Sequence, residues 1–341
     1  MKRIFRSGHV RLIVGLVVLL SVGELLARAL GAAPAYVRGG RIRRACGCRE
    51  LRIGHAPLGM DTSVRYCINR LGLRGELPPD SSWRVITLGN STTECAYIDD
   101  RAAWPVLLQH ALNERGHRVW VGNAGVNGSS TRGNAIFLED HLLGLRPDLI
   151  IFMPGAADRG RISAKQDAGL MAPAQLSPPQ WTVENSVLVG SIVRQLQSRT
   201  PQRIDWSTFT AAKPTADTTH LRGSRLPLAE HGAYVPGYRQ RLVRIAELCA
   251  ANNVRLLFLT QPILAMDSSG TRRIMERYNT ATKEVASARG LPLFDLASEL
   301  AQDQTYYLDG IHFSNAGAAQ VARLVKPFVA AEVERLSEHV P

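Results

Sequence analysis

Short apolar runs alternate with longer amphipathic segments from residue 84 onward. The runs are Arg84–Gly89, Val119–Asn123, Leu149–Met153, Val254–Thr260 and Leu291–Leu296. Apolar residues recur at helical spacing around 103–115, 133–143, 183–198, 238–252, 272–289 and 314–336. Strands that alternate with helices form a parallel sheet covered on both faces. The pattern therefore predicts an α/β fold, a flavodoxin-like three-layer sandwich with a five-stranded parallel sheet.

The first thirty residues have the order of a targeting segment. Basic side chains come first, and the apolar run Leu12–Val22 follows them. Stretched from Val10 to Leu26, the segment approaches the minimum length of a membrane-spanning helix. We expect residues 1–30 to be a signal anchor that leaves the body outside the cytoplasm, in the periplasm or at the cell surface. Secretion after cleavage as a signal peptide is the alternative.

The formal charge of +12 lies mostly before the main domain. Residues 38–74 hold nine arginines against Glu50 and Asp61, whereas residues 75–341 are nearly neutral. An enzyme that acts on nucleic acid carries its basic stripe on the folded domain. The distribution therefore argues against nucleic acid and favours anionic lipid headgroups or an acidic polymer as the partner of the basic segment.

Three regions follow from these patterns. Residues 31–80 look irregular, and we interpret them as a basic linker and an N-terminal extension that packs on the main domain. Residues 81–341 form that domain, with an insert at about 156–236 that is too long for a simple connection and suits a lid or a substrate-shaping segment. If the extension lies outside the cytoplasm, Cys67 can form a disulfide with Cys46 or Cys48. No C-x-x-C pair is present, which argues against a zinc ribbon.

Polar turns follow the strands where the carboxyl ends of a parallel sheet meet. Ser91 follows the first strand, Gly128 the second, and Asp309 and His312 lie in the loop after the last. A carboxylate three residues before a histidine can accept from one imidazole nitrogen and leave the other to face a hydroxyl. We expect Ser91 to be the nucleophile, His312 the base and Asp309 its orienting residue. The backbone N–H groups of Ser91 and Gly128 would form the oxyanion hole.

These blocks resemble those of the SGNH (GDSL-like) hydrolases. Gly89-Asn90-Ser91 is similar to their G-D-S turn, the segment from Asn123 to Gly128 to their second block, and Asp309 with His312 to their D-x-x-H block. The resemblance covers about residues 65–336. Softer matches to membrane-anchored members are Asn69-Arg70-Leu71-Gly72-Leu73-Arg74, Gln261-Pro262 and Tyr278-Asn279.

The resemblance implies a serine-dependent hydrolase of acyl or acetyl esters that needs no metal and no organic cofactor. Its substrate would be an ester-bearing small molecule, a glycan of the envelope or of a secreted polysaccharide, or a lipid. We place Asn127 and Asp158 beside that substrate. Glu94, next to the site, is expected to be a surface or turn charge, and Cys95 is a poor candidate for a nucleophile.

Two positions depart from the family pattern. Asn90 replaces the aspartate before the serine, and Ala157 replaces an asparagine that donates to the oxyanion. Loss of one such donor typically costs a factor of about 10²–10³ in rate. Either Asn127, Arg159 or the insert replaces it, or activity is low, or the chain is a non-catalytic carbohydrate-binding or assembly module. An acetyltransferase that uses the same triad is a separate alternative, because the sequence does not separate acyl transfer to a sugar from hydrolysis.

Overall fold

The structure is a computed structural model that describes residues 8–32, 34, 36–39, 42–56, 60–79, 82–158, 177–199, 202–205, 234–264 and 270–338. A five-stranded parallel sheet forms the centre of the main domain, in the order β10-β9-β7-β5-β6. Its strands are β5 (Trp83–Gly89), β6 (Val119–Gly125), β7 (Leu149–Met153), β9 (Arg255–Leu259) and β10 (Leu293–Phe294). The predicted α/β fold with five parallel strands is confirmed.

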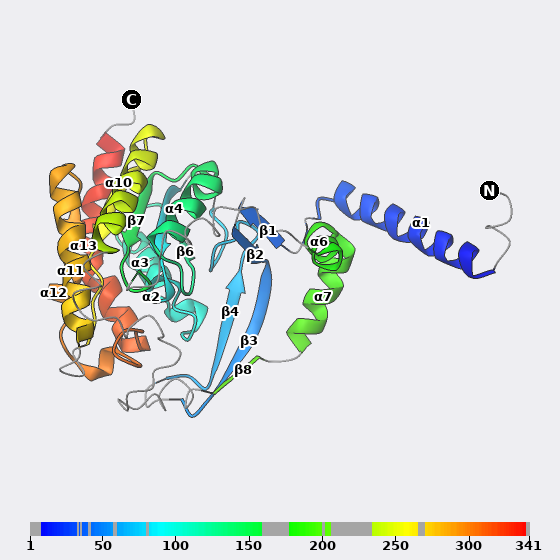
Figure 1. Cartoon of the computed structure of the whole chain (residues 1–341), viewed down its shortest axis with the longest axis horizontal. Helices are drawn as coiled ribbons and strands as arrows, with labels where there is room; N and C mark the ends of the chain where they lie inside the picture. The colour runs from blue at the N-terminus through cyan, green and yellow to red at the C-terminus, as the bar shows by residue number, and fades with distance from the viewer. Residues whose placement is uncertain are drawn as a thin grey trace.

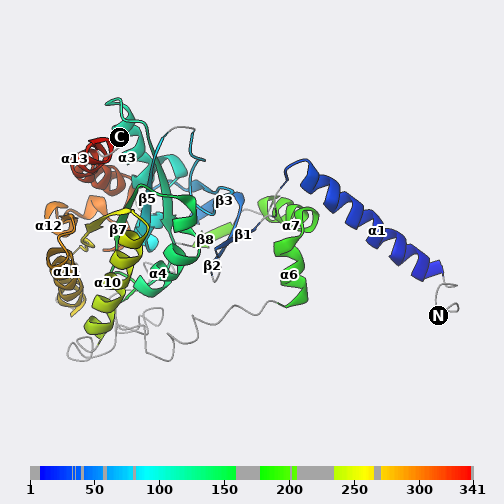
Figure 2. The same ribbon diagram turned by 90° about the horizontal axis from the view of Figure 1, so that it is seen from above.

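Helices cover both faces of this sheet (Figure 2). Ile86, Ile150 and Phe258 point to the face covered by α4 (Thr131–Asp140), α10 (Val235–Ala251) and α11 (Gly270–Ala288). Val85 and Ile151 point to the opposite face, which α3 (Trp104–Asn113) and α13 (Asn315–Glu338) cover. Because both faces are buried, the strands read as continuous apolar runs in the sequence. Short helical segments complete the domain: α2 (Ser91–Glu94), η2 (Asp100–Ala102), η3 (Leu142–Leu145), α12 (Leu296–Glu299) and η6 (Gln304–Tyr306).

The strand order fixes where a ligand can bind. Counted along the chain, the five strands are arranged 2-1-3-4-5, so the winding of the chain reverses between β5 and β7. Open α/β sheets bind their ligands at the carboxyl ends of the strands that flank such a reversal. A ligand is therefore expected at the turns that follow β5, β6 and β7.

The region before the main domain is largely strand, so the expectation of irregular chain there was wrong. β1 (Tyr36–Gly39) pairs with β2 (Ile42–Ala45), and β3 (Gly47–Gly54) lies between β4 (Ser63–Ile68) and β8 (Gln202–Asp205). Alternate side chains of β3 and β4, including Leu51, Val64 and Tyr66, are buried with Tyr97 of the main domain. We call β2, β3 and β4 the N-terminal arm.

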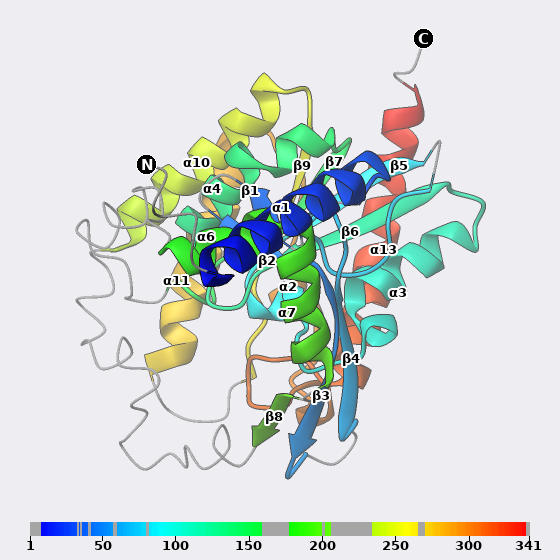
Figure 3. The ribbon, with the colours of Figure 1, turned by 90° about the vertical axis from the view of Figure 1, so that its right-hand side faces the viewer.

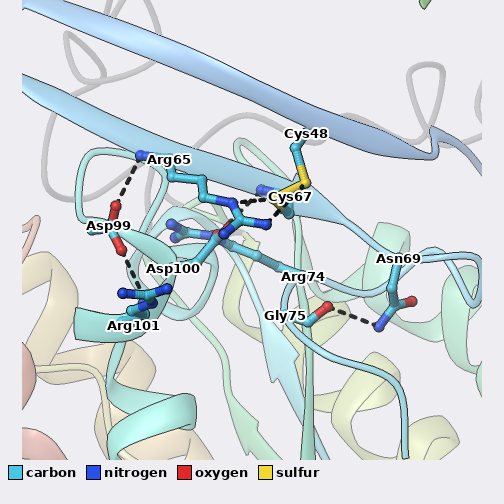
Figure 4. Close-up of a disulfide and its surroundings, with 9 residues drawn as sticks. All are labelled: Cys48, Arg65, Cys67, Asn69, Arg74, Gly75, Asp99, Asp100 and Arg101. Carbon is cyan, nitrogen blue, oxygen red and sulfur yellow. Dashed lines mark hydrogen bonds and ion pairs between the residues drawn. A yellow bond between two sulfur atoms is a disulfide. The ribbon is translucent and has the colours of Figure 1, made fainter.

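A disulfide joins the two long strands of the N-terminal arm. Cys48 and Cys67 face each other across β3 and β4 and are bonded, which is one of the two expected pairs (Figure 4). Two backbone bonds attach β4 to the main domain: the Arg65 N–H donates to Asp99 at 2.9 Å and the Cys67 N–H to Asp100 at 3.2 Å. The disulfide thus cross-links the arm, and the two hydrogen bonds attach the arm to the segment that follows α2.

Helix α1 (Gly8–Ala29) projects away from the body (Figure 1). It is long and apolar enough to cross a membrane, a test that a signal sequence also passes, and none of its residues is buried. The insert supplies α6 (Pro178–Asn185) and α7 (Val187–Arg199), two helices where one was expected. Near the end of α1, which crosses α7 in Figure 3, the Glu24 carboxylate accepts the N–H groups of Val187 and Leu188 at 2.8 and 3.1 Å.

Candidate active site

The turn after β5 places Ser91 at the carboxyl edge of the sheet. Gly89 ends the strand, and a Cβ there would lie 2.1 Å from the Thr93 Oγ1, so only glycine fits. Asn90 caps α2, because its Oδ1 accepts the Thr92 N–H at 3.1 Å. Ser91 is the first residue of α2, where a backbone N–H has no partner within the helix.

The three side chains that we expected to act together form one hydrogen-bonded chain. The Ser91 Oγ lies 2.9 Å from the His312 Nε2, and the His312 Nδ1 lies 2.7 Å from the Asp309 Oδ2. The other oxygen of Asp309 accepts the backbone N–H groups of Ile311 and His312, at 3.1 and 2.8 Å. The D-x-x-H spacing thus closes a tight turn in which one carboxylate fixes both the imidazole and the backbone.

Electrostatics favour the ionised form of Asp309. Burial acts to raise the pKa of this carboxyl, but the hydrogen bonds and the charge of His312 outweigh burial and lower the pKa below its usual value. An ionised Asp309 accepts the Nδ1–H of His312, and the Nε2 can then accept the proton of the Ser91 hydroxyl. The Tyr97 ring meets the imidazole edge-on, with 5.6 Å between ring centroids. A small crevice beside these residues is lined by Tyr97, Ile98 and Phe313.

The turns after β5 and β6 touch each other because the two strands are neighbours. The Asn123 Nδ2 donates to the Thr93 carbonyl at 2.9 Å, and the Asn123 Oδ1 accepts the Gly125 N–H at 2.9 Å. A Cβ at Gly125 would lie 2.1 Å from the backbone nitrogen of Glu94, so this contact also requires glycine. Asn123, which opens the second block, therefore joins the backbone of the turn after β5 to the backbone of the turn after β6.

Gly128 lies in a four-residue turn, Val126–Ser129, that follows β6. The Ser129 N–H donates to the Val126 carbonyl at 3.0 Å. Gly128 has a φ of 72°, which a type II turn requires at its third residue and which glycine adopts without strain. Asn127 and Gly128 are exposed. Gly128, which we expected in the oxyanion hole, and Asn127, which we expected beside the substrate, thus lie at the surface, in the strand connection next to that of Ser91.

Glu94 is buried, not a surface charge as the sequence suggested. Its Oε1 accepts from the Tyr66 hydroxyl at 2.5 Å and from the Arg44 Nη2 at 3.1 Å, and its Oε2 accepts the Asn127 N–H at 2.8 Å. Tyr66 and Arg44 belong to the N-terminal arm, 28 and 50 positions earlier in the chain. No local spacing marks such a partnership, which is why the sequence analysis missed it.

Arg74, the last residue of the softer match N-R-L-G-L-R, supports the chain behind Ser91. Its guanidinium is buried and donates to the carbonyl oxygens of Glu94, Cys95 and Ile98. Its Nε also lies 2.8 Å from Asp100. These bonds satisfy the carbonyls at the end of α2, where helix geometry leaves them without partners.

The second softer match supports α2 from the other side. The Gln261 Oε1 lies 2.8 Å from the Thr92 Oγ1, beside Ser91. Asn279 of α11 holds Gln261 through two bonds to its backbone, at 2.9 and 3.0 Å. Both residues are buried, so their role is to support the turn and not to meet a substrate.

Asp158 does not face the site, contrary to our expectation. Its side chain is buried, and its carboxylate accepts the Thr131 N–H at 3.0 Å, the Thr131 hydroxyl at 2.6 Å and the Arg241 Nη2 at 3.3 Å. Burial raises the pKa of Asp158, although Thr131 and Arg241 oppose the shift. Ala157 precedes it in the turn after β7. Arg159, one of the expected replacement donors, lies outside the described residues.

Cys95 does not provide a second nucleophile, and the described residues hold no candidate metal site. Cys95 is buried, which raises its pKa to about 11, so it is a thiol and not a nucleophilic thiolate at neutral pH. Among the residues that the structure describes, no three histidine, cysteine or acidic side chains gather in a way that could hold a metal ion.

Comparison with known families agrees with this geometry. A sequence profile described as the GDSL-like Lipase/Acylhydrolase family matches residues 87–320. This chain belongs to the GDSL-like lipase/acylhydrolase family. The match spans the turn of Ser91, the turn of Gly128 and the loop of Asp309 and His312, and the family is one of ester hydrolases. No curated protein matches the chain.

Solved structures of GDSL-like and related proteins are similar only at a distance. The lipase/acylhydrolase from Enterococcus faecalis is 16% identical, with 73% of this chain and 96% of that chain covered and a TM-score of 0.44. The acetyl xylan esterase AlAXEase is 14% identical, with coverage of 72% and 98% and a TM-score of 0.45. TesA is 18% identical, with coverage of 72% and 98% and a TM-score of 0.46.

Proposed function

We propose that this chain is a serine-dependent ester hydrolase in which Ser91 attacks the acyl carbon. The hydrogen-bonded chain from the Ser91 Oγ through His312 to Asp309 is the observation that carries the proposal. Membership of the GDSL-like family supports ester hydrolysis as the reaction class.

Each residue has a defined step in the proposed reaction. The Ser91 Oγ bonds to the acyl carbon while the His312 Nε2 takes the hydroxyl proton, and Asp309 stabilises the resulting imidazolium. The backbone N–H groups of Ser91 and Gly128 bind the oxyanion. His312 then gives its proton to the leaving alcohol. Water, deprotonated by His312, attacks the acyl-serine and releases the acid and Ser91.

The surroundings of Ser91 favour a small acyl group. The crevice beside the triad is small, and Tyr97, Ile98 and Phe313 make its lining largely apolar. An acetyl or other short acyl ester fits this description. We place it on an envelope or secreted polysaccharide or on a lipid, because α1 is suited to anchor the body outside the cytoplasm and the arginine-rich segment before the domain suits acidic surfaces.

Labelling with a fluorophosphonate tests the nucleophile directly. The full-length chain, purified in detergent, should form one adduct at Ser91, and Ser91→Ala should form none and lose hydrolysis of p-nitrophenyl acetate by about 10³-fold or more. Ser298→Ala, which removes an exposed hydroxyl on α12, is the matched control and should behave as the wild type. Equal hydrolysis by wild type and Ser91→Ala would refute the assignment.

Ala157 favours a second candidate, a non-catalytic carbohydrate-binding or assembly module, because alanine cannot donate to an oxyanion. A folded wild-type protein without a Ser91 adduct would support that module. If the adduct forms, products from an acetylated sugar decide the acceptor: release of acetate indicates hydrolysis, and a newly acetylated sugar indicates acyl transfer.

A further inference from the structure

Among the described residues, Glu94 meets three hydrogen-bond donors. The donors are the Tyr66 hydroxyl, the Arg44 guanidinium and the backbone N–H of Asn127. All the side chains involved are buried, with 5% of Glu94, 5% of Tyr66 and 8% of Arg44 exposed. Burial, together with the charge of Glu94, raises the pKa of Tyr66 to about 12, so the phenol keeps the proton that it donates. A carboxylate is the only side chain that can satisfy this set of partners.

The Glu94 carboxylate links the N-terminal arm to the turn after β6. Arg44 and Tyr66 hold its Oε1 from β2 and β4, while the Oε2 holds Asn127. The bond from Arg44 is at the same time a buried ion pair, which helps to fix the direction of the carboxylate. A displacement of the arm would therefore move the acceptor of the Asn127 N–H.

The peptide units before and after the one that carries the Gly128 N–H are both held. The Asn127 N–H donates to Glu94, and the Ser129 N–H donates to the Val126 carbonyl. No partner is found for the Gly128 N–H within the described part of the chain. Its direction is consequently set by its two neighbours, and one of these depends on Glu94.

We propose that Glu94 is a positioning residue through which the N-terminal arm fixes the orientation of the Gly128 N–H. The proposal rests on the proposed function, in which that N–H binds the oxyanion. It assigns to the arm a part in catalysis without any contact between arm and substrate. Reaction rates are sensitive to such placement, since a shift of about 1 Å can cost a factor of about 10².

Glu94→Gln tests this role with little change in shape. An amide has one oxygen and one NH₂ group, so one of the three donors must face another donor. We expect faster hydrogen–deuterium exchange at the Asn127 amide in the full-length chain. We also expect roughly tenfold slower labelling of Ser91 by a fluorophosphonate, and a lower kcat for p-nitrophenyl acetate with KM little changed. Glu139→Gln, at an exposed ion pair with Arg244, is the matched control.

Tyr66→Phe provides a milder variant in case Glu94→Gln does not fold. It removes one donor from the arm side and leaves Arg44 on the same oxygen. We expect faster exchange at the Asn127 amide and slower labelling of Ser91, both with smaller amplitude than in Glu94→Gln.

Two results would overturn the proposal. One is unchanged exchange at Asn127 in a folded Glu94→Gln protein, and the other is faster exchange with an unchanged labelling rate. Failure of the proposed function gives a different result, because the wild type itself would then not be labelled. The exchange measurement still decides in that case whether Glu94 holds the turn.

Discussion

Two buried carboxylates hold opposite ends of the connection between β6 and α4, and they use the same kinds of partner. Glu94 binds a backbone N–H at Asn127, a guanidinium and a hydroxyl. Asp158 binds a backbone N–H at Thr131, a guanidinium and a hydroxyl. They differ in what lies behind them, since Glu94 leads to the N-terminal arm and Asp158 to α10 of the main domain.

This difference indicates that Asp158 stabilises the fold, whereas the proposed role of Glu94 is to position the site. Asp158 ties α4 to α10, two helices that already pack on the same face of the sheet. Glu94 ties a turn at the site to strands outside the main domain. The role of a buried carboxylate therefore follows from the elements that it connects and not from the kinds of group that it binds.

Asp158→Ala should produce the largest loss of stability. The substitution leaves the Thr131 N–H without its acceptor and takes one acceptor from Arg241, whose Nε still donates to the Thr131 hydroxyl. The expected cost is about 3 kcal/mol in the free energy of unfolding. Urea denaturation measures this loss. Labelling of Ser91 in the remaining folded protein should change little, whereas a loss as large as that in Glu94→Gln would remove the contrast between the two carboxylates.

Asp303→Ala is a suitable control for that experiment. Asp303 is exposed and accepts the Thr305 N–H at 2.8 Å. Its removal should cost much less stability than the removal of Asp158, because water replaces the lost acceptor.

Ala157→Asn tests whether the turn after β7 lacks a donor to the oxyanion. The substitution restores the amide that the family uses as an oxyanion donor, next to the buried Asp158. We expect kcat for p-nitrophenyl acetate to rise by about 10-fold to 10²-fold. Ala157→Leu, whose side chain has no hydrogen-bond donor, should show no such rise. No gain in the asparagine variant would indicate that another group already fills the role.

Gly128→Ala probes the turn between the two carboxylates. No atom lies within 4 Å of the added Cβ, so the cost comes from the φ of 72° alone. That strain should lower the free energy of unfolding by about 1 kcal/mol. Thermal denaturation measures the loss, and Gly144→Ala, where φ is not positive and space is also open, is the control.

The pH dependence of stability should differ in sign between Asp158 and Asp309. The pKa of Asp309 is lowered by folding, so its contribution is present above the usual aspartate pKa and is lost as the pH falls through the lowered value. The pKa of Asp158 is raised, so folding is favoured at low pH and weakens as the pH rises through the window above the usual value.

Denaturation midpoints measured across pH can test these signs. Asp309→Asn should lose the decline of stability on the acid side, and Asp158→Asn should lose the decline above the usual aspartate pKa. Identical pH profiles for the two variants would contradict the opposite shifts. Both measurements need folded variants, which circular dichroism can verify.

The sequence predicted the sheet well because its signals are local. Buried parallel strands are continuous apolar runs, and each predicted strand boundary lies within two residues of the observed one. The order of the sequence blocks likewise predicted that Ser91, Asp309 and His312 lie at one edge of the sheet. Parallel topology leaves few alternatives for strand ends that follow one another in this way.

Contacts between distant segments were not predictable in the same way. Leu51 and Ile53 alternate with polar residues in β3, and Val64 and Tyr66 do so in β4, so a period of two was present but was obscured by the arginines around it. The role of Glu94 left no local trace. The inward turn of Asp158 depends on Arg241, 83 positions later, and no spacing in the sequence reports it.

The position of His312 also has a consequence for synthesis. Ser91 and His312 are 221 positions apart, and the loop that carries His312 follows β10, the last strand to join the edge of the sheet. A chain emerges from the ribosome with its N-terminus first. In the proposed mechanism the nucleophile is therefore made long before its base, and the unfinished protein holds a serine without the histidine that would activate it.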